Sequence, residues 1–142
     1  MKAVARLLRW AAAAGWCGLI FYLSSLSKPP VPGFFDRIPN GDKLGHFLLY
    51  GVLGLLTYIA QWGERNLALR ARAWIFTILW CALYGASDEF HQNFTPGRSP
   101  DIFDWFADVL GATSAVVFLL VAGFRLRRDK VPGSVPDNTG RP

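Results

Sequence analysis

Residues 87–108 of this 142-residue chain read SDEFHQNFTPGRSPDIFDWFAD, a stretch far more polar than the sequence on either side of it. It contains five of the ten acidic residues, one of the two histidines and an arginine that follows a Pro-Gly pair. The flanking segments are almost uncharged and apolar over lengths that could cross a membrane. The contrast indicates a membrane protein whose polar side chains gather at one end of its helices.

The apolar segments predict the fold class. The composition is 52% hydrophobic with six tryptophans, which is richer than an average soluble protein. Residues 10–27 carry no charge and residues 44–63 only His46, while 73–94 and 102–124 are apolar apart from acids at one end. Continuous apolar runs favour helices over the alternating strands of a membrane barrel. We predict an all-α, integral membrane four-helix bundle with helices at about 8–26, 44–63, 73–93 and 100–124, forming one domain over 1–128, and a disordered cytoplasmic tail at 129–142.

The basic residues predict the orientation. Because positively charged loops tend to remain in the cytoplasm, both termini are expected there and the polar cluster at the outer face of a bacterial-type cytoplasmic (inner) membrane, crossed several times. The first apolar segment has no small-residue cleavage site, so it is expected to remain as a helix. The net charge of +5 is then a topology signal, and no nucleic-acid partner is expected. The basic residues on the predicted cytoplasmic side are Lys2, Arg6, Arg9, Arg65, Arg70, Arg72, Arg125, Arg127, Arg128, Lys130 and Arg141.

A stripe of polar residues opens the second predicted helix. Asp42, His46 and Tyr50 recur every four residues and therefore share one helix face, beside Lys43. A single histidine in such a helix is more often hydrogen-bonded to a neighbouring helix than functional. Three polar groups at helical spacing favour a functional role, because polar groups are costly inside a membrane.

A second polar group lies where the third predicted helix ends and the fourth begins. Ser99-Pro100-Asp101 has the residue types of a helix start, which places Asp104 and Asp108 one turn apart on one face. Two charged carboxylates at that spacing repel unless a cation, a metal or a shared proton lies between them. The candidate cations are Arg98 and Lys43.

If the outer ends of three helices converge, these residues form one outward-opening pocket. The candidate catalytic residues are His46, His91, Asp88 and Asp104. The candidate binding residues are Lys43, Arg98, Asp42, Tyr50, Glu89, Gln92, Asp101 and Asp108. No metal ligands are assigned, because no compact ligand motif is present, although a divalent metal remains an open option as cofactor.

The two polar blocks resemble the VanZ-like family of membrane proteins. The first block corresponds to Asp42, Lys43, His46, Phe47 and Tyr50. The second corresponds to Asp88, Glu89, His91, Gln92, Phe94, Pro96, Gly97, Arg98, Asp101, Asp104 and Asp108. The resemblance covers about residues 8–124 with no departure at a motif position. It implies a protein of the cell envelope and an association with glycopeptide-antibiotic resistance, but no particular reaction.

Three functional hypotheses remain open at this point. The first is a hydrolase or transferase acting on a lipid-linked or phosphate-bearing envelope substrate, in which Arg98 and Lys43 hold the anionic group and a histidine is the general acid or base. The second is a non-catalytic binder or small transporter of a lipid head group, a cell-wall precursor or a glycopeptide antibiotic. The third is a polar network that only fastens the helices together. The lipid bilayer is a partner in all three.

Overall fold

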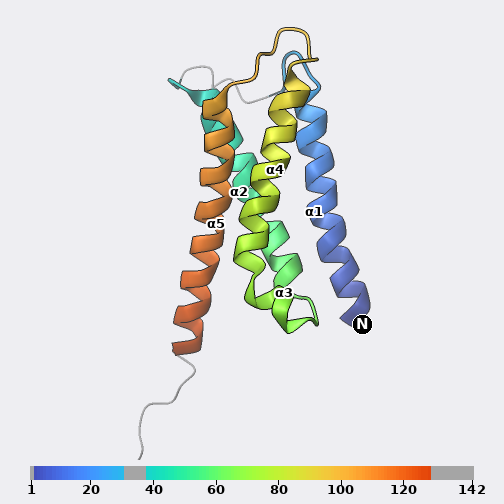
Figure 1. Ribbon diagram of the computed structural model, residues 1–142, viewed down its shortest axis with the longest axis vertical. Helices are drawn as coiled ribbons and strands as arrows, with labels where there is room; N and C mark the ends of the chain where they lie inside the picture. The colour runs from blue at the N-terminus through green and yellow to red at the C-terminus, as the bar shows by residue number, and fades with distance from the viewer. Residues whose placement is uncertain (1, 31–37, 129–142) are drawn as a thin grey trace, which may run out of the picture.

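The computed structural model describes residues 2–30 and 38–128, and within this part of the chain every regular element is a helix (Figure 1). The predicted tail at 129–142 lies outside the described residues. Four helices are long and one is short: α1 (Lys2–Ser24), α2 (Gly41–Trp62), α3 (Leu67–Ala71), α4 (Ala73–Gln92) and α5 (Ile102–Arg128). The prediction of an all-α protein is confirmed.

Local sequence accounts for the ends of these helices. Asn40 precedes α2 in a left-handed conformation, with φ of 59°, which asparagine tolerates better than most residues. Gly97 turns the chain after α4 with φ of 79°, where other side chains would be strained. Helix α5 begins two residues later than predicted, because Asp101 caps it: its Oδ1 accepts a hydrogen bond of 2.9 Å from the backbone N–H of Phe103.

Helix α3 is a separate element rather than an extension of a neighbouring helix. The Asn66 side chain accepts hydrogen bonds from the backbone N–H groups of Ala68 and Leu69, at 2.9 and 3.3 Å. This cap satisfies donors that a helix start otherwise leaves without partners. In Figure 1, α3 lies at the same end of the molecule as the start of α1 and the end of α5, and the α4–α5 connection lies at the opposite end.

Helix α2 packs against each of the other three long helices, and most extensively against α5. Small residues allow this close approach. A Cβ added to Gly54 would lie 2.9 Å from the Cα of Ala112, and one added to Gly111 would overlap the carbonyl of Phe47. Gly54 and Gly111 are thus small residues that let the backbones of α2 and α5 approach closely.

The buried core is small and the outer surface is apolar. Ile20, Tyr50, Leu53, Cys81 and Ala112 form the main buried cluster. Large apolar side chains cover the outward helix faces instead, among them Leu8, Phe21, Leu83, Leu110 and Phe118. Cys81 is buried and Cys17 is partly buried, and both are free thiols.

Within the described part of the chain, three helices are long and apolar enough to cross a membrane: Ala3–Ser24, Gly41–Trp62 and Ile102–Gly123. With the apolar outer surface, this supports association with membrane lipid. Helix α4 has 20 residues and packs against α5 and α2, but Asp88 and Glu89 lie near its end.

Candidate functional site

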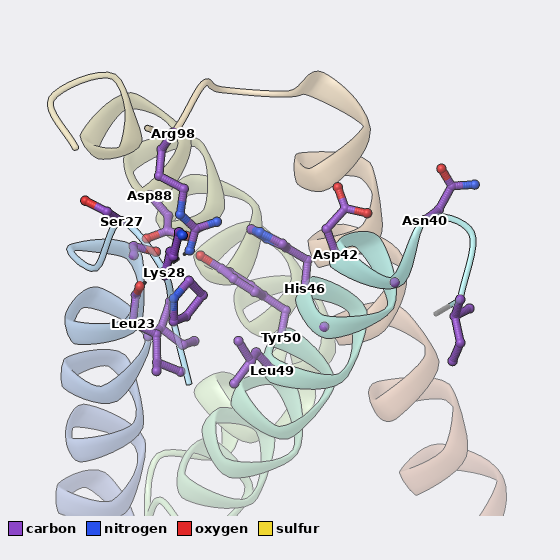
Figure 2. Close-up of a pocket in the computed structure, with 16 residues that line it drawn as sticks. Leu23, Ser27, Lys28, Asn40, Asp42, His46, Leu49, Tyr50, Asp88 and Arg98 are labelled. Atoms are coloured by element: carbon purple, nitrogen blue, oxygen red, sulfur yellow. Dashed lines mark hydrogen bonds between the residues drawn. The ribbon is translucent and has the colours of Figure 1, made fainter. Parts of the chain in front are cut away.

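The predicted polar residues gather where α1 and α4 end and α2 and α5 begin (Figure 2). They form two adjoining groups rather than one pocket. The first lines an open cavity between α1, α2 and α4, and the second is a set of carboxylates between α2, α4 and α5. His46 belongs to both groups, so it connects them.

The cavity has a volume of about 730 Å³, within the usual range for small-molecule sites. One part of its wall is apolar and includes Ile20, Leu23 and Leu49. The rest is polar or charged and includes Lys28, Asp42, His46, Tyr50, Asp88 and Arg98. Such a wall suits a ligand with one polar end and one apolar end.

Arg98 is fixed over the end of α1. Its Nε donates to the carbonyl of Leu26 at 3.3 Å, and its Nη2 to the carbonyl of Leu23 at 3.5 Å. Leu23 lies in the last turn of α1, where its carbonyl also accepts from the backbone N–H of Leu26, and Leu26 follows the helix. Among the described residues, no carboxylate lies within ion-pairing distance of Arg98. The guanidinium therefore brings uncompensated positive charge to the cavity wall.

Lys43 is placed differently from Arg98. Its Nζ lies 2.6 Å from Asp101, 2.9 Å from Asp104 and 3.3 Å from Asp42, so three carboxylates share its charge. The hydrogen bond from Lys43 also lowers the pKa of the Asp101 carboxyl below its usual value. Lys43 is not among the residues lining the cavity. This geometry favours a role in joining α2 to the start of α5.

Glu89 also holds the start of α5. Its Oε2 accepts a hydrogen bond of 2.8 Å from the backbone N–H of Asp101. Its Oε1 is buried without a hydrogen-bond partner. On the same helix, Gln92 donates to Asp88 over 3.4 Å, and both side chains are buried.

His46 and Asp108 form the most buried contact between ionisable side chains of the site. The imidazole Nδ1 lies 3.0 Å from Oδ1 of Asp108, whose side chain is fully buried. Oδ2 of Asp108 has no hydrogen-bond partner, and Gly85 on α4 leaves room for it: a Cβ there would lie 2.8 Å from this oxygen. A carboxylate beside an imidazole fixes its orientation and the nitrogen that carries the proton.

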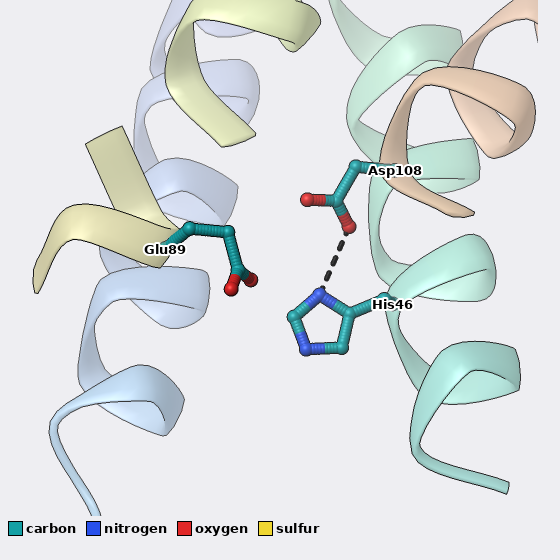
Figure 3. A group of neighbouring side chains, drawn as sticks. All are labelled: His46, Glu89 and Asp108. Carbon is teal, nitrogen blue, oxygen red and sulfur yellow. Dashed lines mark hydrogen bonds and ion pairs between the residues drawn. The ribbon is translucent and has the colours of Figure 1, made fainter. Parts of the chain in front are cut away.

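Glu89 completes a group of three possible metal ligands with this pair (Figure 3). One ligand atom from each of His46, Glu89 and Asp108 lies within 4.8 Å of the other two. The three residues come from α2, α4 and α5. The sequence did not indicate this group, because its members are far apart in the chain.

The other histidine is outside the cavity wall. His91 lies 3.0 Å from Oγ of Ser25 and stacks on Phe21, with ring centroids 4.5 Å apart. These contacts hold the ring of His91 against the end of α1. Of the two predicted catalytic histidines, only His46 lines the cavity.

The end of α1 contributes residues that the sequence analysis did not select. Leu23, Ser24, Ser27 and Lys28 all line the cavity. The sequence pattern of this segment predicted only an apolar helix. A signal was present, because the uncharged run that starts at residue 10 ends with Ser24, Ser25 and Ser27, followed by Lys28.

Comparison with known proteins agrees with the resemblance of the two polar blocks. Uncharacterized protein C11E3.10 of Schizosaccharomyces pombe (strain 972 / ATCC 24843) is 37% identical over 81 residues, which are 56% of this chain and 47% of that protein. The chain thus spans about half the length of this curated relative. No solved structure matches the chain. The family model VanZ/LLP1 matches residues 10–123, which include all of α2 and α4 and most of α1 and α5. The chain therefore belongs to the VanZ/LLP1 family.

Proposed function

We propose that this protein binds an amphiphile with an anionic, phosphate-type head group in the cavity between α1, α2 and α4. The observation that carries the proposal is the position of Arg98 on the wall of this cavity, part of which is apolar. Arg98 is half-buried, and no carboxylate of the described chain pairs with it. A planar guanidinium can donate two parallel hydrogen bonds to a phosphate.

The charge around the cavity supports an anionic head group. Lys28 lies on the same wall as Arg98 and also lacks an ion pair among the described residues. The two acids of the wall have different partners. Asp42 accepts a hydrogen bond from Lys43, and Asp88 accepts one from Gln92. Among the described residues, the wall thus carries two cations, Arg98 and Lys28, that no carboxylate contacts within ion-pairing distance.

The apolar part of the wall supports an attached hydrocarbon chain. Ile20, Leu23 and Leu49 line the cavity, and the outer faces of the same helices expose Phe21 and Leu48. A chain leaving the cavity could thus pass to a lipid-facing surface. Since a protein of Schizosaccharomyces pombe is similar to this one, a lipid phosphate common to different kinds of membrane suits the site better than a cell-wall precursor or a glycopeptide antibiotic.

We further propose that all four long helices cross a bacterial-type cytoplasmic membrane as a bundle, with both termini cytoplasmic and the cavity facing outward. Helix α4 is about 30 Å long, which matches the hydrocarbon thickness. The start of α1 and the α2–α4 connection lie at one end and carry Arg6, Arg9 and Arg65. The distribution of basic residues supports this orientation.

Catalysis on the same amphiphile is a second candidate, favoured by the contact between His46 and Asp108. An imidazole oriented by a carboxylate is a common general base or acid. His46 also lines the cavity, so it could act on a head group held by Arg98. Hydrolysis or transfer at the phosphate is the reaction class that this arrangement would serve.

Thermal stabilisation of the purified protein tests head-group binding. A long-chain alkyl phosphate should raise the melting temperature by mass action, whereas the uncharged alcohol of the same chain length should not. Inorganic phosphate tests whether the chain is needed. The shift should disappear in Arg98→Ala but persist in Arg65→Ala, which removes an exposed basic residue outside the cavity. Equal shifts with the phosphate and the alcohol would contradict the proposal.

Cysteine labelling tests the orientation. Thr95 is a poor reporter, since it is buried and donates a hydrogen bond to the carbonyl of Ser24, whereas Ser99 in the same connection is exposed. With Cys17 and Cys81 replaced by alanine, a Ser99→Cys variant should react with a membrane-impermeant maleimide in intact cells. A cysteine at the exposed position of Arg65 should react only after permeabilisation. The reverse pattern would place the cavity on the cytoplasmic side.

A further inference from the structure

We infer that His46, Glu89 and Asp108 bind one divalent metal ion at the edge of the cavity. The inference rests on the group itself and does not require the proposed amphiphile. It adds a cofactor to a site that the sequence analysis left without metal ligands.

The geometry of the three side chains fits a single ion. Their ligand atoms lie within 4.8 Å of one another, and they come from three helices, α2, α4 and α5 (Figure 3). Metal–ligand bonds to imidazole nitrogen and carboxylate oxygen are about 2.0–2.2 Å long, so opposite ligands lie about 4 Å apart. Small side-chain rotations suffice to bring the three atoms into contact with a common ion.

Two oxygens in this group lack partners. Oε1 of Glu89 and Oδ2 of Asp108 have no hydrogen bond, although Glu89 is 8% exposed and Asp108 is 0% exposed. A buried acceptor without a partner costs about 1–3 kcal/mol, and more when it is charged. A metal ion would satisfy both oxygens at once.

The two carboxylates of the group also favour a bound cation. Lys43 lies within ion-pairing distance of Asp101 and Asp104, but neither it nor any other described lysine or arginine contacts Glu89 or Asp108. His46 is thus the one described basic side chain in contact with the pair of acids, through Asp108. A single proton or an imidazolium carries one positive charge, whereas a divalent ion can compensate the negative charges of both carboxylates.

The ligand types indicate the class of metal. One imidazole and two carboxylates, with no thiolate in the group, suit zinc or manganese better than a thiophilic ion. The backbone N–H of Asp101 already holds the other oxygen of Glu89, as an outer contact that orients a metal ligand would. Because His46 also lines the cavity, a free coordination position could face it.

Metal content of the purified chain tests the inference. After exposure to Zn²⁺ and removal of loosely bound ions, elemental analysis should find about one ion per chain in the wild type. Asp108→Asn and Glu89→Gln keep the side-chain shapes and should retain less than about a tenth of this amount, because an amide is a much weaker ligand than a carboxylate. Asp104→Asn is the matched control: it removes a buried acid one turn away that pairs with Lys43, and should leave the content unchanged.

A second measurement uses the wild type alone, in case a variant does not accumulate. Co²⁺ added to the metal-free protein should give saturable visible absorption, since a protein-bound ion of low coordination number absorbs far more strongly than the hydrated ion. No saturable Co²⁺ or Zn²⁺ uptake by the wild type would overturn the inference, as would full retention in Asp108→Asn. A bound metal without a thermal shift by alkyl phosphate would retain the metal site and reject the head-group proposal.

Discussion

A Gly111→Leu variant is expected not to accumulate as a folded membrane protein. Even a Cβ at this position would overlap the carbonyl of Phe47 on α2 and would lie 3.1 Å from the backbone nitrogen of Gly51 on the same helix. Overpacking a close interface costs about 1–3 kcal/mol or more, and α2 against α5 is the largest helix contact in the structure. Since total stability is only about 5–15 kcal/mol, this loss should be visible as low yield and aggregation in size-exclusion chromatography.

Gly123→Leu provides the control on the same helix. No atom lies within 4 Å of a Cβ added there, so the leucine should be accommodated and the variant should elute like the wild type. If Gly111→Leu gave the wild-type yield and melting temperature, the close approach of α2 and α5 would be wrong, and with it the placement of Asp108 beside His46.

An Arg98→Glu variant is expected to lose most of its affinity for an alkyl phosphate. The substitution removes a hydrogen-bond donor and replaces an attractive charge by a repulsive one on a cavity wall that also carries Asp88. Loss of a hydrogen bond to a charged group, worth about 1.5–3 kcal/mol, corresponds to a dissociation constant roughly 10- to 100-fold larger. Isothermal titration in a neutral detergent would measure it.

Two further substitutions separate charge from structure at Arg98. Arg98→Gln keeps a donor for the carbonyls of Leu23 and Leu26 but no charge, so it should fold and still bind weakly. Arg98→Lys keeps the charge without the planar fork and should recover part of the affinity. Normal binding by Arg98→Gln, combined with a lower melting temperature, would assign Arg98 to holding the end of α1 only.

Much of the fold follows from the distribution of apolar residues. The helices predicted at 44–63 and 73–93 correspond to Gly41–Trp62 and Ala73–Gln92. The first helix was predicted from residue 8, but α1 begins at Lys2, because a helix end outside the hydrocarbon region tolerates charges such as Arg6 and Arg9. An apolar run thus marks the lipid-facing length of a helix and underestimates its full extent.

The candidate site was predictable as a set of residues but not as an arrangement. Spacing by four placed Asp42, His46 and Tyr50 on one face, and His46 and Tyr50 do line the cavity beside Asp42. Local spacing does not specify which helix faces that stripe. The sequence also could not show that Lys43 and Arg98 differ. Three carboxylates lie within ion-pairing distance of Lys43, and no carboxylate of the described residues does so for Arg98. The proximity of Glu89 to His46 and Asp108 likewise depends on packing between α2, α4 and α5.

The most direct test of the proposed function is equilibrium binding of a radiolabelled lipid phosphate to the protein in nanodiscs of zwitterionic lipid. The wild type and Arg65→Glu should both show saturable binding at about one site per chain, competed by unlabelled alkyl phosphate, and Arg98→Glu should show none above empty nanodiscs. Comparing two charge reversals controls for the overall charge of the protein. Saturable binding that is equally strong in Arg98→Glu, or no saturable binding by the wild type, would contradict the assignment of this cavity to an anionic head group.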